Sequence, residues 1–184
     1  MIIWLLIILL PTLAIVLAVM TVLFAFALVN RIRCYKKIKQ ICKIKKYKIT
    51  FPRKLLASFF KYSNQPDIVI ETPDENYLVR FITCAEKSLF YKFPTAEWYV
   101  SFERILSSPI NPTGRFKHLP RLDEKYNSEN GSVENKYIMV FAPRMPKVNY
   151  LDAKNPDQAV VGNTSNIENW TIYDNEHFIE LIAK

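Results

Sequence analysis

The sequence predicts an α+β protein: an N-terminal transmembrane helix, then a small, mostly antiparallel β domain that ends in a C-terminal helix. Three observations predict this class. The first thirty residues contain no charged side chain. After residue 64, short runs of β-branched and aromatic residues alternate with prolines, asparagines and charges, as strands alternate with turns. The chain closes on an aspartate followed by apolar residues at helical spacing, which predicts a capped helix.

The apolar segment is long enough and apolar enough to cross a membrane. Between residues 2 and 29, 19 of 28 residues are Leu, Ile, Val or Phe. At about −0.3 to −0.6 kcal/mol each, these residues favour insertion by roughly −6 to −11 kcal/mol in total. A helix of this length measures about 42 Å, against about 30 Å of hydrocarbon. We therefore assign residues 1–30 to a transmembrane helix, with its core near residues 3–29.

A cleaved secretory signal is the alternative interpretation of the same segment. Ala25-Phe26-Ala27 has the small-x-small form of a cleavage site. However, no positive charge precedes the run, and the run is about twice the ~7–15 residues of a signal's apolar region. These two features favour a retained span.

Positive charge flanks only one end of the span. No Lys or Arg precedes it, and nine follow within residues 31–48. Positively charged flanks stay inside, so we expect the N-terminus outside the cell membrane and the C-terminal domain in the cytoplasm. We assign the nine residues as candidate lipid-binding residues: Arg31, Arg33, Lys36, Lys37, Lys39, Lys43, Lys45, Lys46 and Lys48.

The basic character belongs to the region beside the membrane. The chain is +8 overall, but residues 1–66 carry twelve Lys or Arg and no acid, whereas residues 67–184 carry 13 bases and 17 acids. This pattern favours the lipid bilayer and its anionic headgroups as partner, at about 1 kcal/mol per cation near the surface. Nucleic acid is not expected. The lysines alternatively enforce topology and bind no ligand.

Residues 31–63 form a predicted basic juxtamembrane segment with a short helix. Apolar residues recur at every third position from Ile32 to Tyr47, so their stripe slips by about 60° per step around a helix. This spacing predicts a helical extension of the span without an amphipathic face. A short docking helix is expected over residues 53–62, after Pro52.

Residues 64–184 are predicted to form one α+β domain. Residues 67–72 and 77–83 read as a hairpin, residues 136–142 as a central buried strand, and residues 107–135 as a long surface connection. Asp174 is the expected N-cap of a helix over residues 175–183. Further strands are expected at residues 88–93, 98–104, 148–152, 159–161 and 170–173, with a turn at Gly162.

Motifs for nucleotide, metal or cofactor chemistry are not found. The chain has three glycines in all and no Gly-rich phosphate loop, and its three cysteines form no C-x-x-C pair. His118 and His177 have no partner nearby in sequence that would activate them. We therefore expect no cofactor and no metal. Cys34 is either a packing residue or, at the membrane surface, an acylation site.

One catalytic pattern is present in part. Pro66-Asp67 opens a strand as in the PD-(D/E)xK nucleases, which this stretch resembles. That resemblance implies a Mg²⁺ site in which Asp67 and Glu71 share one strand face. The following strand departs from the pattern, with Leu78 and Arg80 where an acid and a lysine are required. A degenerate nuclease-like metal-dependent domain is thus the alternative function.

The whole arrangement resembles small uncharacterised single-span membrane proteins of low-GC Gram-positive bacteria. The residues that carry the resemblance are the span, the Lys-rich flank, an ETP…YLVRF hairpin, a VFAP strand and a closing WTIY…HFIELI segment. It implies an architecture and no activity.

The sequence therefore favours a membrane-anchored interaction or structural module over an enzyme. Trp98 or Trp170 would contact a protein partner unless they lie in the core. Three N-x-S/T triplets, at Asn130, Asn163 and Asn169, leave an extracytoplasmic domain as a further interpretation.

Overall fold

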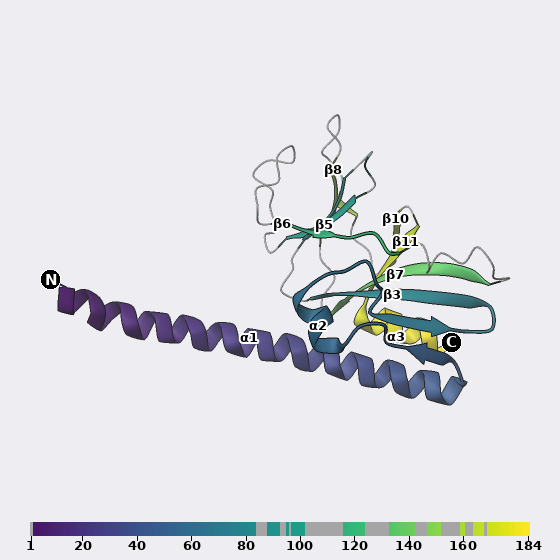
Figure 1. The fold of residues 1–184 in the computed structure, drawn as a ribbon, viewed down its shortest axis with the longest axis horizontal. Helices are drawn as coiled ribbons and strands as arrows, with labels where there is room; N and C mark the ends of the chain where they lie inside the picture. The colour runs from purple at the N-terminus through teal and green to yellow at the C-terminus, as the bar shows by residue number, and fades with distance from the viewer. Residues whose placement is uncertain are drawn as a thin grey trace.

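The computed structural model of the chain describes residues 2–83, 88–92, 95, 97–101, 116–123, 133–142, 147–151, 159–160, 164–167 and 169–184. Within these ranges a long N-terminal helix lies beside two sheets and a short C-terminal helix (Figure 1). The helices are α1 (Ile2–Lys45), α2 (Leu55–Phe60) and α3 (Asn175–Ala183). The strands are β1 (Lys48–Thr50), β2 (Ile68–Glu71), β3 (Glu75–Thr83), β4 (Ser88–Lys92), β5 (Glu97–Ser101), β6 (Phe116–Leu119), β7 (Glu134–Ala142), β8 (Lys147–Leu151), β9 (Ala159–Val160), β10 (Thr164–Ile167) and β11 (Trp170–Asp174).

Helix α1 runs without interruption from the apolar segment into the domain. It is 44 residues long. Its first half projects away from the sheets and its second half lies along them (Figure 1). The predicted helical extension beyond the span is therefore confirmed.

The second half of α1 does have one buried face, so the prediction that it lacks an amphipathic face was wrong. The buried side chains recur every three or four residues, which keeps them on one side of the helix. Two cysteines and an arginine complete this stripe, which the spacing of the isoleucines and tyrosines alone does not show. The buried residues are Arg31, Cys34, Tyr35, Ile38 and Cys42.

The central strand of the larger sheet is β7. The order of this six-stranded sheet is β1-β2-β3-β7-β11-β10, and β7 pairs in parallel with both β3 and β11. A strand with parallel neighbours is covered on both faces and reads as a continuous apolar run. The predicted central buried strand at residues 136–142 is confirmed, as is the hairpin of β2 and β3.

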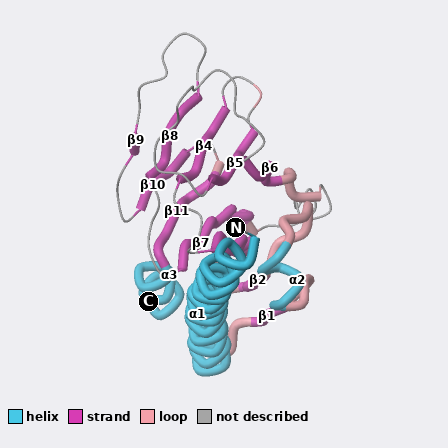
Figure 2. Tube along the Cα trace, turned by 90° about the vertical axis from the view of Figure 1, so that its left-hand side faces the viewer, coloured by secondary structure: helices cyan, strands magenta, loops and turns pink. Residues whose placement is uncertain are grey.

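The six-stranded sheet separates two cores. Along β3, Val79 and Phe81 point to the helices, where they join a core with α1 and α3. Ile82 points the other way, into a core shared with the five-stranded sheet, where it meets Trp98 and Val100 of β5. Figure 2 shows the resulting order: α1 and α3 on one side, then the larger sheet, then the smaller one.

The smaller sheet, in the order β6-β5-β4-β8-β9, repeats one pairing of the larger sheet. Strand β4 pairs in parallel with β8, just as β3 pairs with β7. Both β3 and β7 begin with Glu-Asn, and Asn76 Nδ2 donates to Asn135 Oδ1, 59 residues along the chain, at 3.2 Å. The parallel pairs of both sheets join residues that are 59 positions apart in the chain. The chain therefore passes from the larger sheet to the smaller one twice in the same register.

The predicted architecture agrees with the structure in outline. Among the described strands, six of the nine pairings are antiparallel. Strands β1, β6 and β10 were not predicted, and β6 lies inside the supposed surface connection at residues 107–135. Gly162 and the rest of that connection, apart from residues 116–123 and 133–135, lie outside the described residues.

Helix α3 begins where the sequence predicted. The Asp174 side chain accepts hydrogen bonds from the backbone N–H groups of Glu176 at 3.0 Å and His177 at 2.9 Å, as an N-cap does. Phe178 and Ile182 then pack into the core beneath α1.

Two isoleucines on the same helix test how firmly α1 packs on the sheet. Ile38 is 0% exposed and Ile44 is 71% exposed. Ile38→Ala should lower the free energy of unfolding by about 2–5 kcal/mol, because it leaves a cavity between helix and sheet. Ile44→Ala is the matched control and should change it by less than about 0.5 kcal/mol. The measurement is urea unfolding of the full chain in detergent micelles; equal midpoints for the two variants would contradict this packing.

Candidate functional site: the junction between the apolar helix and the domain

The environment of α1 changes within one helical turn. The large apolar side chains from Leu9 to Phe26 are exposed, as is Val29, and this helix is long and apolar enough to cross a membrane. Arg31, the first charged residue of the chain, is 2% exposed. The junction between the apolar segment and the domain therefore coincides with a buried charge.

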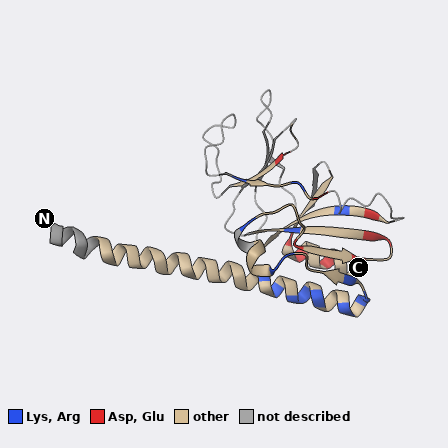
Figure 3. Cartoon of the chain, viewed as in Figure 1, with Lys and Arg blue, Asp and Glu red and all other residues tan. Residues whose placement is uncertain are grey.

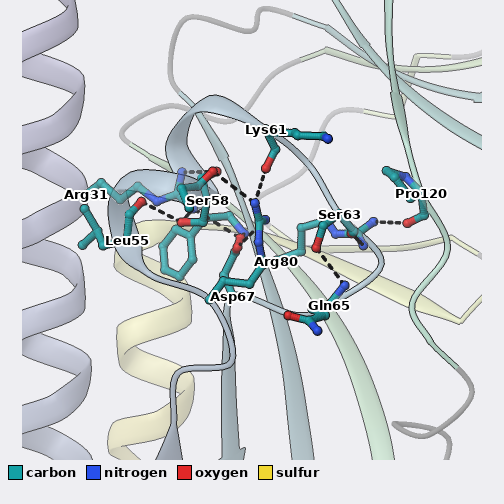
Figure 4. Close-up of polar contacts among 12 residues, drawn as sticks. Arg31, Leu55, Ser58, Lys61, Ser63, Gln65, Asp67, Arg80 and Pro120 are labelled. Atoms are coloured by element: carbon teal, nitrogen blue, oxygen red, sulfur yellow. Dashed lines mark hydrogen bonds and ion pairs between the residues drawn. The ribbon is translucent and has the colours of Figure 1, made fainter.

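Asp67 is the centre of the polar contacts at this junction (Figure 4). Its carboxylate accepts hydrogen bonds from Arg31 Nη2 at 3.2 Å, Arg53 Nη1 at 3.0 Å and the backbone N–H of Phe81 at 2.7 Å. Burial raises the pKa of the Asp67 carboxyl, and the charge of Arg31 and the Phe81 hydrogen bond oppose that rise. Asp67 thus joins α1, the segment before α2, and β3 at one point.

The two arginines also hold α2 in place. Arg31 donates to the Ser58 hydroxyl at 2.9 Å and to the Ser58 carbonyl at 3.3 Å. Arg53 donates to the carbonyls of Ala57, at 3.1 Å, and Lys61. The last carbonyls of a helix have few partners within it, so these guanidinium donors satisfy acceptors in the second half of this short helix.

A third arginine is buried on the opposite face of the sheet. Arg80 donates to the carbonyls of Ser63 at 2.7 Å and Pro120 at 2.8 Å, and its guanidinium lies 5.5 Å from the centre of the Trp170 ring. Burial lowers the pKa of Arg80 to about 10. Arg80 is thus held by two carbonyl oxygens and an aromatic ring and, among the described residues, not by a second buried carboxylate besides Asp67. The cluster of Arg31, Arg53, Asp67 and Arg80 is built to fasten chain segments together.

The nine predicted lipid-binding residues fall into two groups. Arg31 is turned into the domain, and the other eight are exposed. Figure 3 shows the cations spread along the second half of α1. At the far end of the helix, Lys48 forms an ion pair with Glu71 at 2.9 Å, and Lys45 Nζ donates to the Lys184 carbonyl at 3.0 Å.

The proposed metal pair of Asp67 and Glu71 is not assembled. The Asp67 side chain is 1% exposed and engaged by three donors, while Glu71 faces Lys48 at the other end of β2. Among the described residues, no group of three His, Cys, Asp or Glu side chains is placed to hold a metal ion. Loss of any activity on Asp67 substitution would report lost folding and could not identify a metal ligand.

The other candidate residues make packing or hydrogen-bond contacts within the fold. Trp98 is buried between the two sheets, and Trp170 packs on that same core beside Tyr137. His177 Nδ1 lies 2.8 Å from the Asp174 carboxylate, whose hydrogen bond raises the pKa of the histidine. His118 lies against the Tyr99 ring at 5.3 Å. Cys34 is buried against the sheet.

The sequence contains one local signal for the buried cluster. Arg31, Cys34, Tyr35 and Ile38 lie at helical spacing, and including the arginine in this stripe would have placed it on the buried face. Its acidic partner, 36 residues away, has no such local signal.

No protein-family model, curated protein or solved structure matches this chain. The resemblance to single-span proteins of low-GC Gram-positive bacteria stays a prediction.

Two acids test the importance of the buried cluster: Asp67, directly before β2, and Glu71, at the end of β2. Asp67→Asn keeps the size of the side chain and removes the charge that Arg31 and Arg53 share, so it should destabilise the domain by about 3–5 kcal/mol. Glu71→Gln is the matched control, and because its ion pair is exposed it should cost less than about 1 kcal/mol. Urea unfolding of the full chain in micelles measures both. Similar midpoints would show that the cluster does not fasten the helix to the domain.

Proposed function

We propose that this chain is a single-pass membrane protein whose small domain is held against the inner leaflet and serves as an interaction or structural module. The observation that carries the proposal is the continuity of α1. Its exposed apolar half leads directly into a half buried in the domain, with the Arg31–Asp67 contact at the junction. Since no linker intervenes, the surfaces of the domain are presented at a fixed height and angle to the bilayer.

The orientation of the span follows from its flanks. Nine Lys or Arg lie within residues 31–48 and none lies before the span. Cytoplasmic flanks carry this excess, which supports an N-terminus outside and a domain inside.

The proposed lipid contact differs along the helix. At about 1.5 Å per residue, Arg33, Lys36 and Lys37 lie within roughly 9 Å of the level of Arg31 along the helix axis. Lys45 lies about 21 Å beyond that level, which is more than twice the ~8 Å over which salt screens charge. For a helix near the membrane normal, the first three cations are therefore the ones that contact anionic headgroups. Farther from the junction, Lys45 donates to the Lys184 carbonyl and Lys48 pairs with Glu71 instead.

Reporter fusions at Lys184 test the topology. A green fluorescent protein fusion should fluoresce and an alkaline phosphatase fusion should be inactive in a bacterial host, and alkaline carbonate should leave the chain in the membrane fraction. The control variant carries three lysines before Ile2 and Lys36→Gln, Lys37→Gln and Lys39→Gln, which should shift the population towards the opposite orientation. An active phosphatase fusion of the original chain would place the domain outside and overturn the proposal.

A further inference from the structure

Helix α2 lies beside α1 at the level where the apolar segment ends. The hydrogen bonds from Arg31 to Ser58 fix this level, because Arg31 is the first charged residue after the span. Figure 1 shows α2 at the end of the domain that faces the projecting half of α1. In a bilayer-spanning chain, α2 is thus set at the membrane surface.

Leu55 of α2 packs against the core, but the next described side chains of this helix are arranged opposite to those of a helix on a water-soluble domain. Ser58 is 0% exposed and receives the Arg31 guanidinium, whereas Leu56 is 57% exposed. The neighbouring Ala57 is also exposed. A surface helix normally buries its apolar residues and exposes its polar ones. The inversion is stable here because Arg31 and Arg53 satisfy the polar groups from the inside.

Cations stand at both ends of α2. Lys54 directly precedes the helix and Lys61 directly follows it, and both are exposed. Lysine stems reach across apolar surface while their ammonium groups stay in the polar layer. An exposed leucine between two lysines therefore matches the surface of a bilayer, where an anionic headgroup layer covers apolar acyl chains.

The exposed apolar side chains of α1 end close to the level of α2. Phe26 is exposed little more than one turn before Arg31, on the side of the junction where the bilayer begins. We propose that α2 is a second membrane contact: Leu56 enters the boundary between headgroups and acyl chains, and Lys54 and Lys61 bind the phosphates of anionic lipids. This inference rests on the proposed membrane anchoring. It would give the domain two attachments to the bilayer and so fix its rotation about α1.

Spin labels at three sites test this contact in the full chain. Single cysteines replace Leu56, Ile44 and Leu23 in turn, in a chain that carries Cys84→Ser. Cys34 and Cys42 are retained because they are buried, and the chain without a new cysteine measures any label they take up. The labelled protein is placed in vesicles of phosphatidylcholine and phosphatidylglycerol at three to one. Collision rates with oxygen, which concentrates in lipid, and with a water-soluble nickel chelate are then compared.

The label at residue 56 should show a higher oxygen-to-nickel ratio than the label at residue 44, and a lower one than the label at residue 23. Ile44 is the matched control, an exposed apolar residue far along α1 from the junction. If the label at residue 23 is buried in lipid but the label at residue 56 is as accessible to nickel as that at residue 44, only this inference is overturned. A label at residue 56 shielded from both reagents overturns it in favour of a protein partner. A wet label at residue 23 overturns the membrane anchoring itself.

The two lysines provide a separate test of the lipid chemistry. In the chain labelled at residue 56 with all lysines intact, the oxygen-to-nickel ratio should rise when phosphatidylglycerol is added to pure phosphatidylcholine vesicles. Lys54→Gln with Lys61→Gln should abolish that rise. Lys39→Gln with Lys43→Gln, which removes the same charge from α1, should leave the rise intact. If the ratio rises equally in the chain that carries both Lys54→Gln and Lys61→Gln, then Lys54 and Lys61 are excluded as the lipid ligands.

Discussion

The buried contact between Arg31 and Asp67 is the constraint on which the rest of the structure depends. Taking each ion out of water costs several kcal/mol, and Asp67 recovers this through Arg31, Arg53 and the amide of Phe81. The recovery requires one position of α1 on the sheet. A shift of one residue along the helix would turn Arg31 by about 100° and leave Asp67 with an incomplete set of donors. The contact therefore fixes the register between helix and domain.

A fixed register has a mechanical consequence. Helix α1 is continuous across the junction, and α3 and the larger sheet pack against its second half. Any tilt or rotation of the apolar half is therefore transmitted to the sheets, since no flexible linker absorbs it. Under the proposed anchoring, the bilayer would set the orientation of the domain as well as its location.

The fold was predictable where the signal is local. The apolar run of β7 and the Asp174 cap of α3 are each specified by a few adjacent residues, and both were predicted. The missed strands β1, β6 and β10 all lie at the edge of a sheet. Edge strands are short and carry polar residues, as in the sequences KIT, FKHL and TSNI, so they lack the apolar alternation that identifies a strand.

The site was less predictable because it joins residues that no local pattern connects. A lysine- and arginine-rich flank has the composition of a solvated segment, and one of its members nevertheless belongs to the core. The sequence shows that Arg31 follows the span and that Asp67 opens a strand. That the two meet depends on β2 and the segment before α2 folding back along α1, which is a property of the tertiary structure.

Under the proposed topology, the burial of Arg31 is compatible with a part in orienting the helix, because the two events would be separated in time. At about 5–20 residues per second, synthesis of the 36 residues between Arg31 and Asp67 takes roughly 2–7 s. Under the proposed topology, Arg31 counts among the nine flanking charges while the helix inserts. Once Asp67 and β3 are in place, it leaves the aqueous phase and fixes the domain to the helix. Under that proposal the same residue contributes first to orientation and then to the fold, and the other eight cations remain exposed at the surface.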